Sequence, residues 1–130
     1  MGESNACMKR IVAAPTAGAC GVVPAVYLTL QEQRQIDDER MLEQCILHSG
    51  VGGVIANRAF LAGAAGGCQA EIGSASSMAA AGAVYLAGGD TEAIIHAAAM
   101  AMKNLLGLAC DPVAGLVEVA LCEAKCCRCS

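Results

Sequence analysis

Aromatic residues are nearly absent from this chain of 130 residues, which has no tryptophan, two tyrosines and one phenylalanine. Hydrophobic residues still make up 56% of the sequence and are mostly small or aliphatic, and they are accompanied by 15 glycines. Small side chains allow helices to approach one another closely, whereas sheets are enriched in β-branched and aromatic residues. The composition therefore favours a compact all-α fold over a sandwich of sheets.

The sequence also lacks a basic patch, a long apolar run and a secretion signal. Because the formal net charge is −4, we expect no nucleic-acid partner. The longest apolar candidate, Ile94 to Met102, contains His96 and is much shorter than the roughly 18 residues that a membrane span needs. Residues 1–5 do not show the charged and then apolar pattern of a signal peptide. We expect a cytoplasmic protein without a membrane segment, folded as a single domain over residues 1–130.

Helical spacing of apolar residues, together with residues that favour helix ends, predicts that most of the chain is helical. Asp38 and Asp90 are the expected caps, and Gly88 and Gly107 the expected stops. The predicted helices run from about Val23 to Gln35, from residues 37–39 to about Ile55, from Ser74 or Ser76 to Leu86, from Glu92 to Leu106, and over a short stretch from Val113 to Leu121.

Glycines gather at places where helices are expected to cross or end. Gly50, Gly52 and Gly53 fall inside the second predicted helix, where they mark either a close crossing or a break. Residues 63–68, Gly-Ala-Ala-Gly-Gly-Cys, are expected to form a flexible loop. Glycine there permits close backbone approach to a ligand, although an ordinary linker has the same composition. Residues 15–21, Pro-Thr-Ala-Gly-Ala-Cys-Gly, are expected to form a turn.

Nine cysteines are present, and three explanations compete for them. A disulfide framework is typical of small, loop-rich secreted chains, and free cysteines also serve as small buried hydrophobes. The alanine-rich, helical character favours ligation of a metal or cluster over disulfides. Cys68 follows two glycines, Cys110 precedes Asp-Pro, and Cys122 comes soon after an apolar run. Helix ends and glycine loops can present a thiolate to a metal, but this spacing alone is weak evidence.

The residues around these cysteines are more specific than their spacing. Residues 15–24, 67–73 and 110–115 closely resemble, in order, three stretches of the α domain of iron–sulfur-dependent L-serine dehydratases. The Ser-Ala-Ser-Ser-Met-Ala-Ala-Ala run at 74–81 and Leu-Gly-Leu at 106–108 also fit. The resemblance extends from about residue 9 to residue 119.

This resemblance implies a mainly helical domain that holds a 4Fe–4S cluster on three cysteines, with the fourth iron open to substrate. Cys68 and Cys110 match the first two ligands, and Cys122 is the expected third. The family deaminates L-serine to pyruvate and ammonia without pyridoxal phosphate, using the open iron as a Lewis acid on the hydroxyl. We therefore expect an L-serine dehydratase, a lyase of amino-acid degradation and gluconeogenesis.

Other polar residues are weaker candidates for the site. Glu71, three residues after Cys68, is the carboxylate expected nearest the cluster and the candidate for a catalytic role, or else an ordinary surface acid at a helix start. His48 and His96 lie in helical patterns, where a histidine is more often a core or surface residue than a catalytic base. The expected substrate-binding residues are Thr16, Gly18, Asn57 and Gln69, of which Thr16 and Asn57 would otherwise cap turns.

Parts of the family pattern have no counterpart in this sequence. The family has a longer N-terminal part of the α domain and a β domain with a Ser-Ser-Ser-His type motif. A serine- and glutamate-containing stretch is replaced here by residues 58–65, Arg-Ala-Phe-Leu-Ala-Gly-Ala-Ala. We expect this chain to be the C-terminal portion of an α domain. Its expected partners are L-serine, the missing N-terminal α segment and a β domain or chain, within an oligomer.

The C-terminal tail leaves several alternatives open. Cys122, Cys126, Cys127 and Cys129 offer thiolates for zinc, although all four crowd into one segment, which makes a tetrahedral site awkward. A tail cysteine as an internal fourth ligand of the cluster is another option. We expect residues 123–130 to be a disordered tail. The rival functions are a related cluster-dependent lyase acting on cysteine or threonine, an inactive fragment, and a zinc-binding structural protein.

Overall fold

Helices form nearly all of the part of the chain that the structure describes, which confirms the all-α fold class. The computed structural model describes residues 7–19 and 21–106, and the backbone of residues 112–113 and 116–117. The elements are the 3-10 turn η1 (Ala17–Ala19), the helices α2 (Val22–Arg34), α3 (Asp38–Arg58), α4 (Gly63–Gly66), α5 (Cys68–Leu86) and α6 (Thr91–Asn104), and the strands β1 (Pro112–Val113) and β2 (Leu116–Val117). None of the described helices is both long and apolar enough to cross a bilayer.

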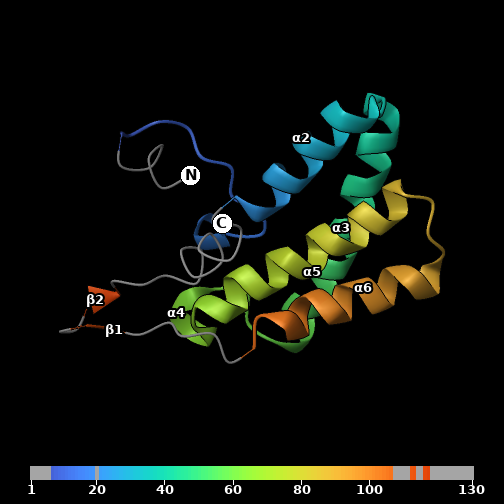
Figure 1. Ribbon diagram of the computed structural model, residues 1–130. Helices are drawn as coiled ribbons and strands as arrows, with labels where there is room; N and C mark the ends of the chain where they lie inside the picture. Colours follow the sequence, from blue (N-terminus) through green and yellow to red (C-terminus); the bar gives the residue numbers. More distant parts are fainter. Residues whose placement is uncertain (1–6, 20, 107–111, 114–115, 118–130) are drawn as a thin grey trace.

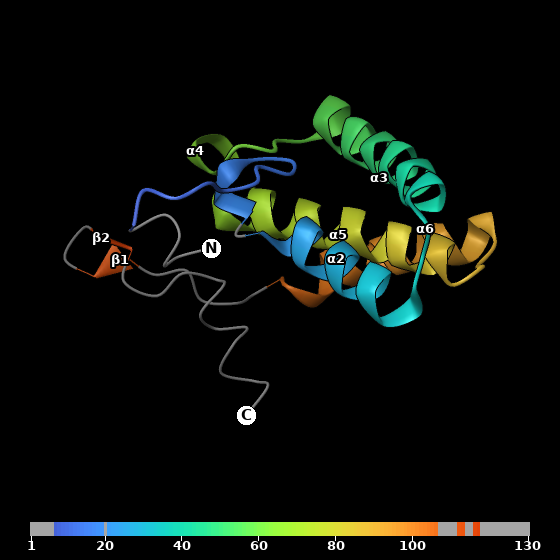
Figure 2. The same cartoon turned by 90° about the horizontal axis from the view of Figure 1, so that it is seen from above.

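Helix α5 lies at the centre of the fold, and α2, α3 and α6 pack around it (Figures 1 and 2). Every residue from Ile72 to Ala79 is buried, as are Ala81 and Gly82. A helix that is buried on all sides needs small or apolar side chains around its whole circumference. The run of Ala, Ser and Gly in α5 meets this condition, so three helices approach its axis closely.

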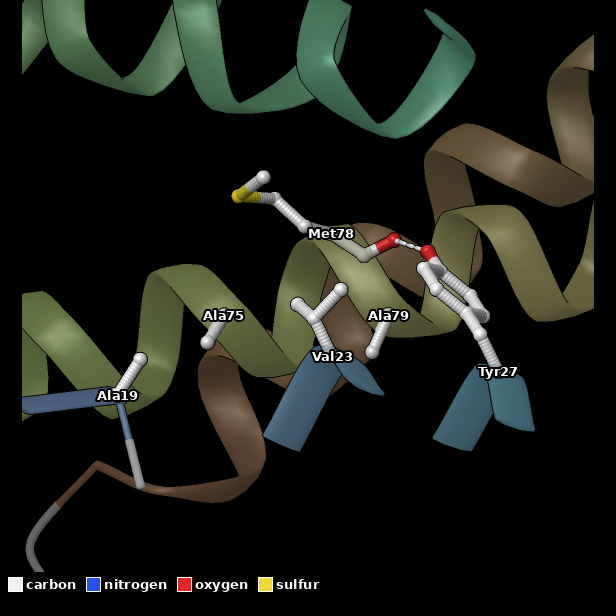
Figure 3. Close-up of a cluster of buried hydrophobic side chains, with 6 residues drawn as sticks. All are labelled: Ala19, Val23, Tyr27, Ala75, Met78 and Ala79. Atoms are coloured by element: carbon white, nitrogen blue, oxygen red, sulfur yellow. Dashed lines mark hydrogen bonds between the residues drawn. The ribbon is translucent and has the colours of Figure 1, made fainter. Parts of the chain in front are cut away.

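The largest buried apolar cluster joins α2 to α5 (Figure 3). Tyr27 of α2 contributes the one large ring, and its hydroxyl donates to the Met78 carbonyl at 2.8 Å. Burial raises the pKa of the Tyr27 phenol, so the group remains a donor throughout the physiological range. The cluster consists of Ala19, Val23, Tyr27, Ala75, Met78 and Ala79.

Aspartates start both α3 and α6. The Asp90 carboxylate accepts from the Ala93 N–H at 2.8 Å, which confirms the predicted cap. At α3 the prediction was wrong by one residue: Asp37, not Asp38, accepts from the Arg40 N–H at 2.8 Å. A capping side chain must reach the N–H three residues ahead from a residue with extended backbone, and Asp37 has that conformation.

The start of α5 differs most from the sequence-based expectation. The prediction began this helix at Ser74 or Ser76, but it begins at Cys68. The segment 63–68, which was expected to be a flexible loop, instead contains the short helix α4. Gly67, which follows α4, has a positive φ of +78°. Residues 68–74 are helical although Gly73 lies among them, because tertiary packing supports the helix and helix propensity alone does not include that support.

Helix α3 continues without a break through its three glycines to Arg58. Of the two predicted alternatives, the close crossing is confirmed at Gly52. A Cβ at this position would lie 2.9 Å from the Met78 sulfur. At Gly50 and Gly53, by contrast, an added Cβ would meet no other part of the described chain within 4 Å, apart from the neighbouring backbone of its own helix. Among the three glycines of α3, Gly52 is therefore the one whose missing side chain matters for packing within the described residues.

The ends of the later elements were predicted unevenly. Helix α5 stops before Gly88, which has φ of +86° as expected of a glycine stop. Gly107 lies outside the described residues. The predicted helix from Val113 to Leu121 is wrong where the structure describes it, because β1 and β2 pair antiparallel with Val113 opposite Leu116. β-Branched residues beside a glycine favour a strand over a helix.

Candidate functional site

The Glu71 carboxylate joins two segments that the sequence singled out separately. Glu71 lies in the first turn of α5 and is half-buried. The Thr16 hydroxyl donates to Glu71 Oε1 at 2.9 Å across 55 residues of sequence. A Cβ added at Gly18 would overlap the carboxylate, and one added at Gly63 would lie 2.6 Å from Oε2. The carboxylate thus rests against the backbone of two glycines.

The arrangement of the elements explains this meeting. Both η1 and α4 contact α5, and they lie at the end of α5 that begins with Cys68 (Figures 1 and 2). The same helix end is therefore the meeting point of the turn predicted at residues 15–21 and the loop predicted at residues 63–68. Thr16 and Gly18, two of the expected substrate-binding residues, lie in direct contact with Glu71 there.

Cys68 is the first residue of α5 and is half-buried. Gly67 before it has no side chain with which to cap the helix. The positive end of a helix dipole stabilises a thiolate, and thiolates are the ligands that iron–sulfur clusters use. The donor chemistry of Cys68 therefore fits the expected cluster.

The complete ligand set remains a prediction. Cys110 and Cys122 lie outside the described residues. Within residues 7–19 and 21–106, no three His, Cys, Asp or Glu side chains are placed to hold a metal ion together.

Gln69 faces away from Glu71, since residues two apart on a helix point in nearly opposite directions. Its Nε2 donates to the Met102 carbonyl of α6 at 3.1 Å. Among the described residues, its Oε1 is the one buried side-chain oxygen or nitrogen that has no hydrogen-bond partner. Gln69 borders a cavity of about 250 Å³, which is lined by Ile55, Ala59, Phe60, Gly66, Gln69, Ala70, Ser74 and Met102.

Asn57 has a local role in the structure. It is exposed in the last turn of α3, and its Nδ2 donates to the Gly53 carbonyl at 2.9 Å within the same helix. This hydrogen bond matches the alternative that Asn57 serves its own backbone. The structure records no contact from Asn57 to Thr16 or Glu71 among the described residues.

His48 belongs to the core, as its helical pattern suggested. It is 8% exposed, and its Nδ1 lies 3.3 Å from Oε1 of the fully buried Gln44. Its ring centroid is 5.2 Å from that of Tyr27. Burial lowers the pKa of His48, so the ring is neutral at pH 7. His96 is instead exposed beside Glu92, with His96 Nε2 3.6 Å from Glu92 Oε1.

Gln44 is the polar residue that the sequence analysis missed. It lies four residues before His48, so the two side chains share a helix face and meet. That spacing is visible in the sequence. Only the packing shows that this face turns inward, beside a cavity of about 360 Å³ that Tyr27, Cys45 and His48 help to line.

Comparison with known proteins gives a consistent result. A family model described as "Serine dehydratase alpha chain" matches residues 1–128. A "Probable L-serine dehydratase, alpha chain" of Bacillus subtilis is 52% identical over 117 residues, which is 90% of this chain and 39% of that protein. The "L-serine dehydratase, alpha chain" of Peptoniphilus asaccharolyticus is 49% identical over 89% of this chain and 40% of its own length.

More distant relatives agree with these two. "L-serine dehydratase TdcG" of Escherichia coli is 45% identical over 93% of this chain and 27% of its own length. This chain therefore spans about a quarter to two-fifths of these three relatives. No solved structure gives a significant match.

Proposed function

The chain belongs to the serine dehydratase alpha chain family, and on that basis we propose that it takes part in the deamination of L-serine to pyruvate and ammonia. The observation that carries the proposal is the hydrogen bond between Thr16 and Glu71. It brings two of the three stretches that resemble the family, residues 15–24 and 67–73, to the same helix end. That convergence is expected if both stretches serve one site.

The proposed cofactor is a 4Fe–4S cluster held by Cys68, Cys110 and Cys122, and the proposal needs no pyridoxal phosphate. When bound, the cluster would supply a Lewis acid for the serine hydroxyl, which is otherwise a poor leaving group. Cys68 would contribute its thiolate from the first residue of α5.

The proposed substrate contacts come from the residues around this helix end. Thr16 and Gly18 belong to the turn that contacts Glu71. Gln69 projects from another side of the same helix end, so its buried, unpartnered Oε1 would contact substrate only from the cavity of about 250 Å³ that it borders. Asn57, the fourth candidate, would have to release the Gly53 carbonyl before its amide could bind substrate. We propose that Glu71 supplies the carboxylate of the site, in the same first helical turn as Cys68.

We also propose that the active form is larger than this chain and is cytoplasmic. The relatives are much longer, and several are named as alpha chains. A β domain or chain, an N-terminal α segment and an oligomeric assembly would complete the site. Large apolar side chains exposed on the described surface support contact with further protein: Met8, Val12, Leu28, Leu42, Ile46, Val54, Phe60, Ile95, Met100 and Leu106.

The test is anaerobic reconstitution of the chain with iron and sulfide, followed by metal analysis and visible absorbance. We expect iron uptake by the original chain and by Cys45→Ser, and loss of uptake in Cys68→Ser. Pyruvate formation from L-serine is then measured with the α and β segments of a longer relative added, and compared with L-threonine and L-cysteine. Bound zinc, or equal iron retention in Cys68→Ser, contradicts the proposal.

A further inference from the structure

We infer that Glu71 is a positioning residue, whose carboxylate holds the η1 turn and the start of α4 against the first turn of α5. In this role it fixes the helix end that presents Cys68. The inference rests on the proposed function only in taking Cys68 as a cluster ligand. It adds a specific task for Glu71, which acts through the two glycine segments rather than on the substrate.

The contacts of the carboxylate come from three separate parts of the chain. Oε1 accepts from the Thr16 hydroxyl at 2.9 Å. Gly18 of η1 lies directly against the carboxylate, and Gly63 at the start of α4 lies against Oε2. A hydrogen bond to a charged acceptor is stronger than one between neutral groups, so this side chain is well suited to hold short segments against the helix.

The two glycines reveal what the fold requires at this place. Neither Gly18 nor Gly63 is among the glycines with positive φ, so any residue could adopt their backbone conformation. At both positions an added Cβ would have to displace the Glu71 carboxylate. Two separate segments thus each place a glycine against the same side chain, Glu71.

Helix geometry connects this contact to Cys68. Residues three apart on a helix lie on the same face, one turn apart, so Cys68 and Glu71 project from the same side of α5. The first turn of a helix also favours a carboxylate, because the N-terminal end carries partial positive charge. Release of Glu71 would therefore loosen both glycine segments about one helical turn from the proposed ligand.

The decisive measurement is amide hydrogen exchange of the full chain over residues 14–19 and 62–67. We expect Glu71→Gln, Gly18→Ala and Gly63→Ala each to raise exchange in both segments by about tenfold, the change expected when one charge-assisted hydrogen bond is weakened. Gly50→Ala and Gly53→Ala are matched controls, because an added Cβ meets nothing there, and they should leave both segments unchanged.

A double variant separates the proposed contact from general damage. If Gly18→Ala acts by displacing the carboxylate, its effect should nearly disappear in a Glu71→Ala background, where the overlap no longer exists. Additive effects of the two substitutions would overturn the inference. Circular dichroism confirms that each variant is still helical, and Glu71→Gln, which keeps the shape of the side chain, remains informative if Glu71→Ala does not fold.

The link to Cys68 has its own readout, the iron content and visible spectrum after anaerobic reconstitution. Thr16→Ser keeps the hydroxyl and should match the original chain, whereas Thr16→Val and Glu71→Gln should bind less iron or show a shifted spectrum. If the original chain takes up no iron while the exchange results hold, the proposed function fails and the carboxylate contact stands. If exchange rises but iron and spectrum do not change, the positioning of Cys68 is overturned.

Discussion

The two halves of α5 are built differently. From Ile72 to Gly82 every residue except Ala80 is buried between α2, α3 and α6, and the small residues pack at close range. Its first turn, which carries Cys68 and Glu71, is half-buried. Two short glycine-containing segments cover this turn and contact the Glu71 carboxylate. The buried half supplies stability, and the first turn supplies accessible polar groups.

This difference explains why the candidate site lies where it does. Segments with few apolar contacts open more easily than a packed core, and functional groups are drawn from that less stable part of a structure. The core also contains polar groups, Tyr27, Gln44 and His48, but these bond mainly to one another and to the backbone. Substitutions in the two halves should therefore produce different kinds of effect.

The largest expected effect is on the buried half. A Cβ at Gly82 would overlap the Tyr27 hydroxyl and would lie 2.6 Å from Gln44 Oε1. We expect Gly82→Ala to lower the free energy of unfolding by about 1–3 kcal/mol, the usual cost of overpacking. Urea unfolding measures this loss of unfolding free energy. Gly50→Ala, at an exposed helix position, should instead be neutral or raise stability by up to about 1 kcal/mol. Equal behaviour of the two variants would remove the distinction between packed and open glycines.

Removal of the Tyr27 hydroxyl should have a somewhat smaller effect. Tyr27→Phe keeps the buried ring and deletes the 2.8 Å hydrogen bond to the Met78 carbonyl. We expect a loss of about 0.5–1.5 kcal/mol in unfolding free energy. In Tyr85→Phe, a surface hydroxyl that donates to Glu43 is deleted, and little change is expected. A larger loss in Tyr85→Phe than in Tyr27→Phe would contradict the assignment of Tyr27 to the core.

The cap of α6 tests whether global stability and order at the Cys68 end can vary separately. Asp90→Ala deletes the acceptor for the Ala93 N–H, and caps of this kind contribute about 1 kcal/mol. Thermal unfolding should record the loss. Hydrogen exchange in residues 14–19 and 62–67 should stay within twofold of the original, because neither segment contacts the cap. A selective increase in those segments would show that the two ends of α5 are coupled.

The smallest effect concerns pH. The folded-state pKa of His48 is lowered from 6.5, so between the folded value and 6.5 the unfolded chain binds more protons than the folded one. His48 therefore contributes stability above pH 6.5 that is lost as pH falls through the folded pKa. Denaturant midpoints measured from pH 7.5 to 5 should fall less steeply for His48→Gln than for His96→Gln, whose site is exposed. Identical slopes would place His48 outside the core.

Local signals in the sequence predicted much of this structure. The cap at Asp90, the stop at Gly88 and the span of α2 follow from side-chain chemistry within a few residues. The family resemblance likewise came from short motifs. The start of α5 was missed because the glycines of residues 63–67 suggested a loop, whereas packing around Ile72 extends the helix back to Cys68. The burial of Gln44 was also missed, because it too depends on how the helices pack.

For the candidate site, too, some features follow from the sequence and others only from the tertiary structure. Sequence alone determined that the chain is helical, which residues begin and end several helices, and which polar residues are candidates, since these depend on neighbours along the chain. Only the tertiary structure decided that Thr16, Gly18 and Gly63 meet on the Glu71 carboxylate, while Asn57 stays within its own helix. Such contacts depend on how α5 is surrounded, and that arrangement follows from burial of the whole core rather than from any local pattern.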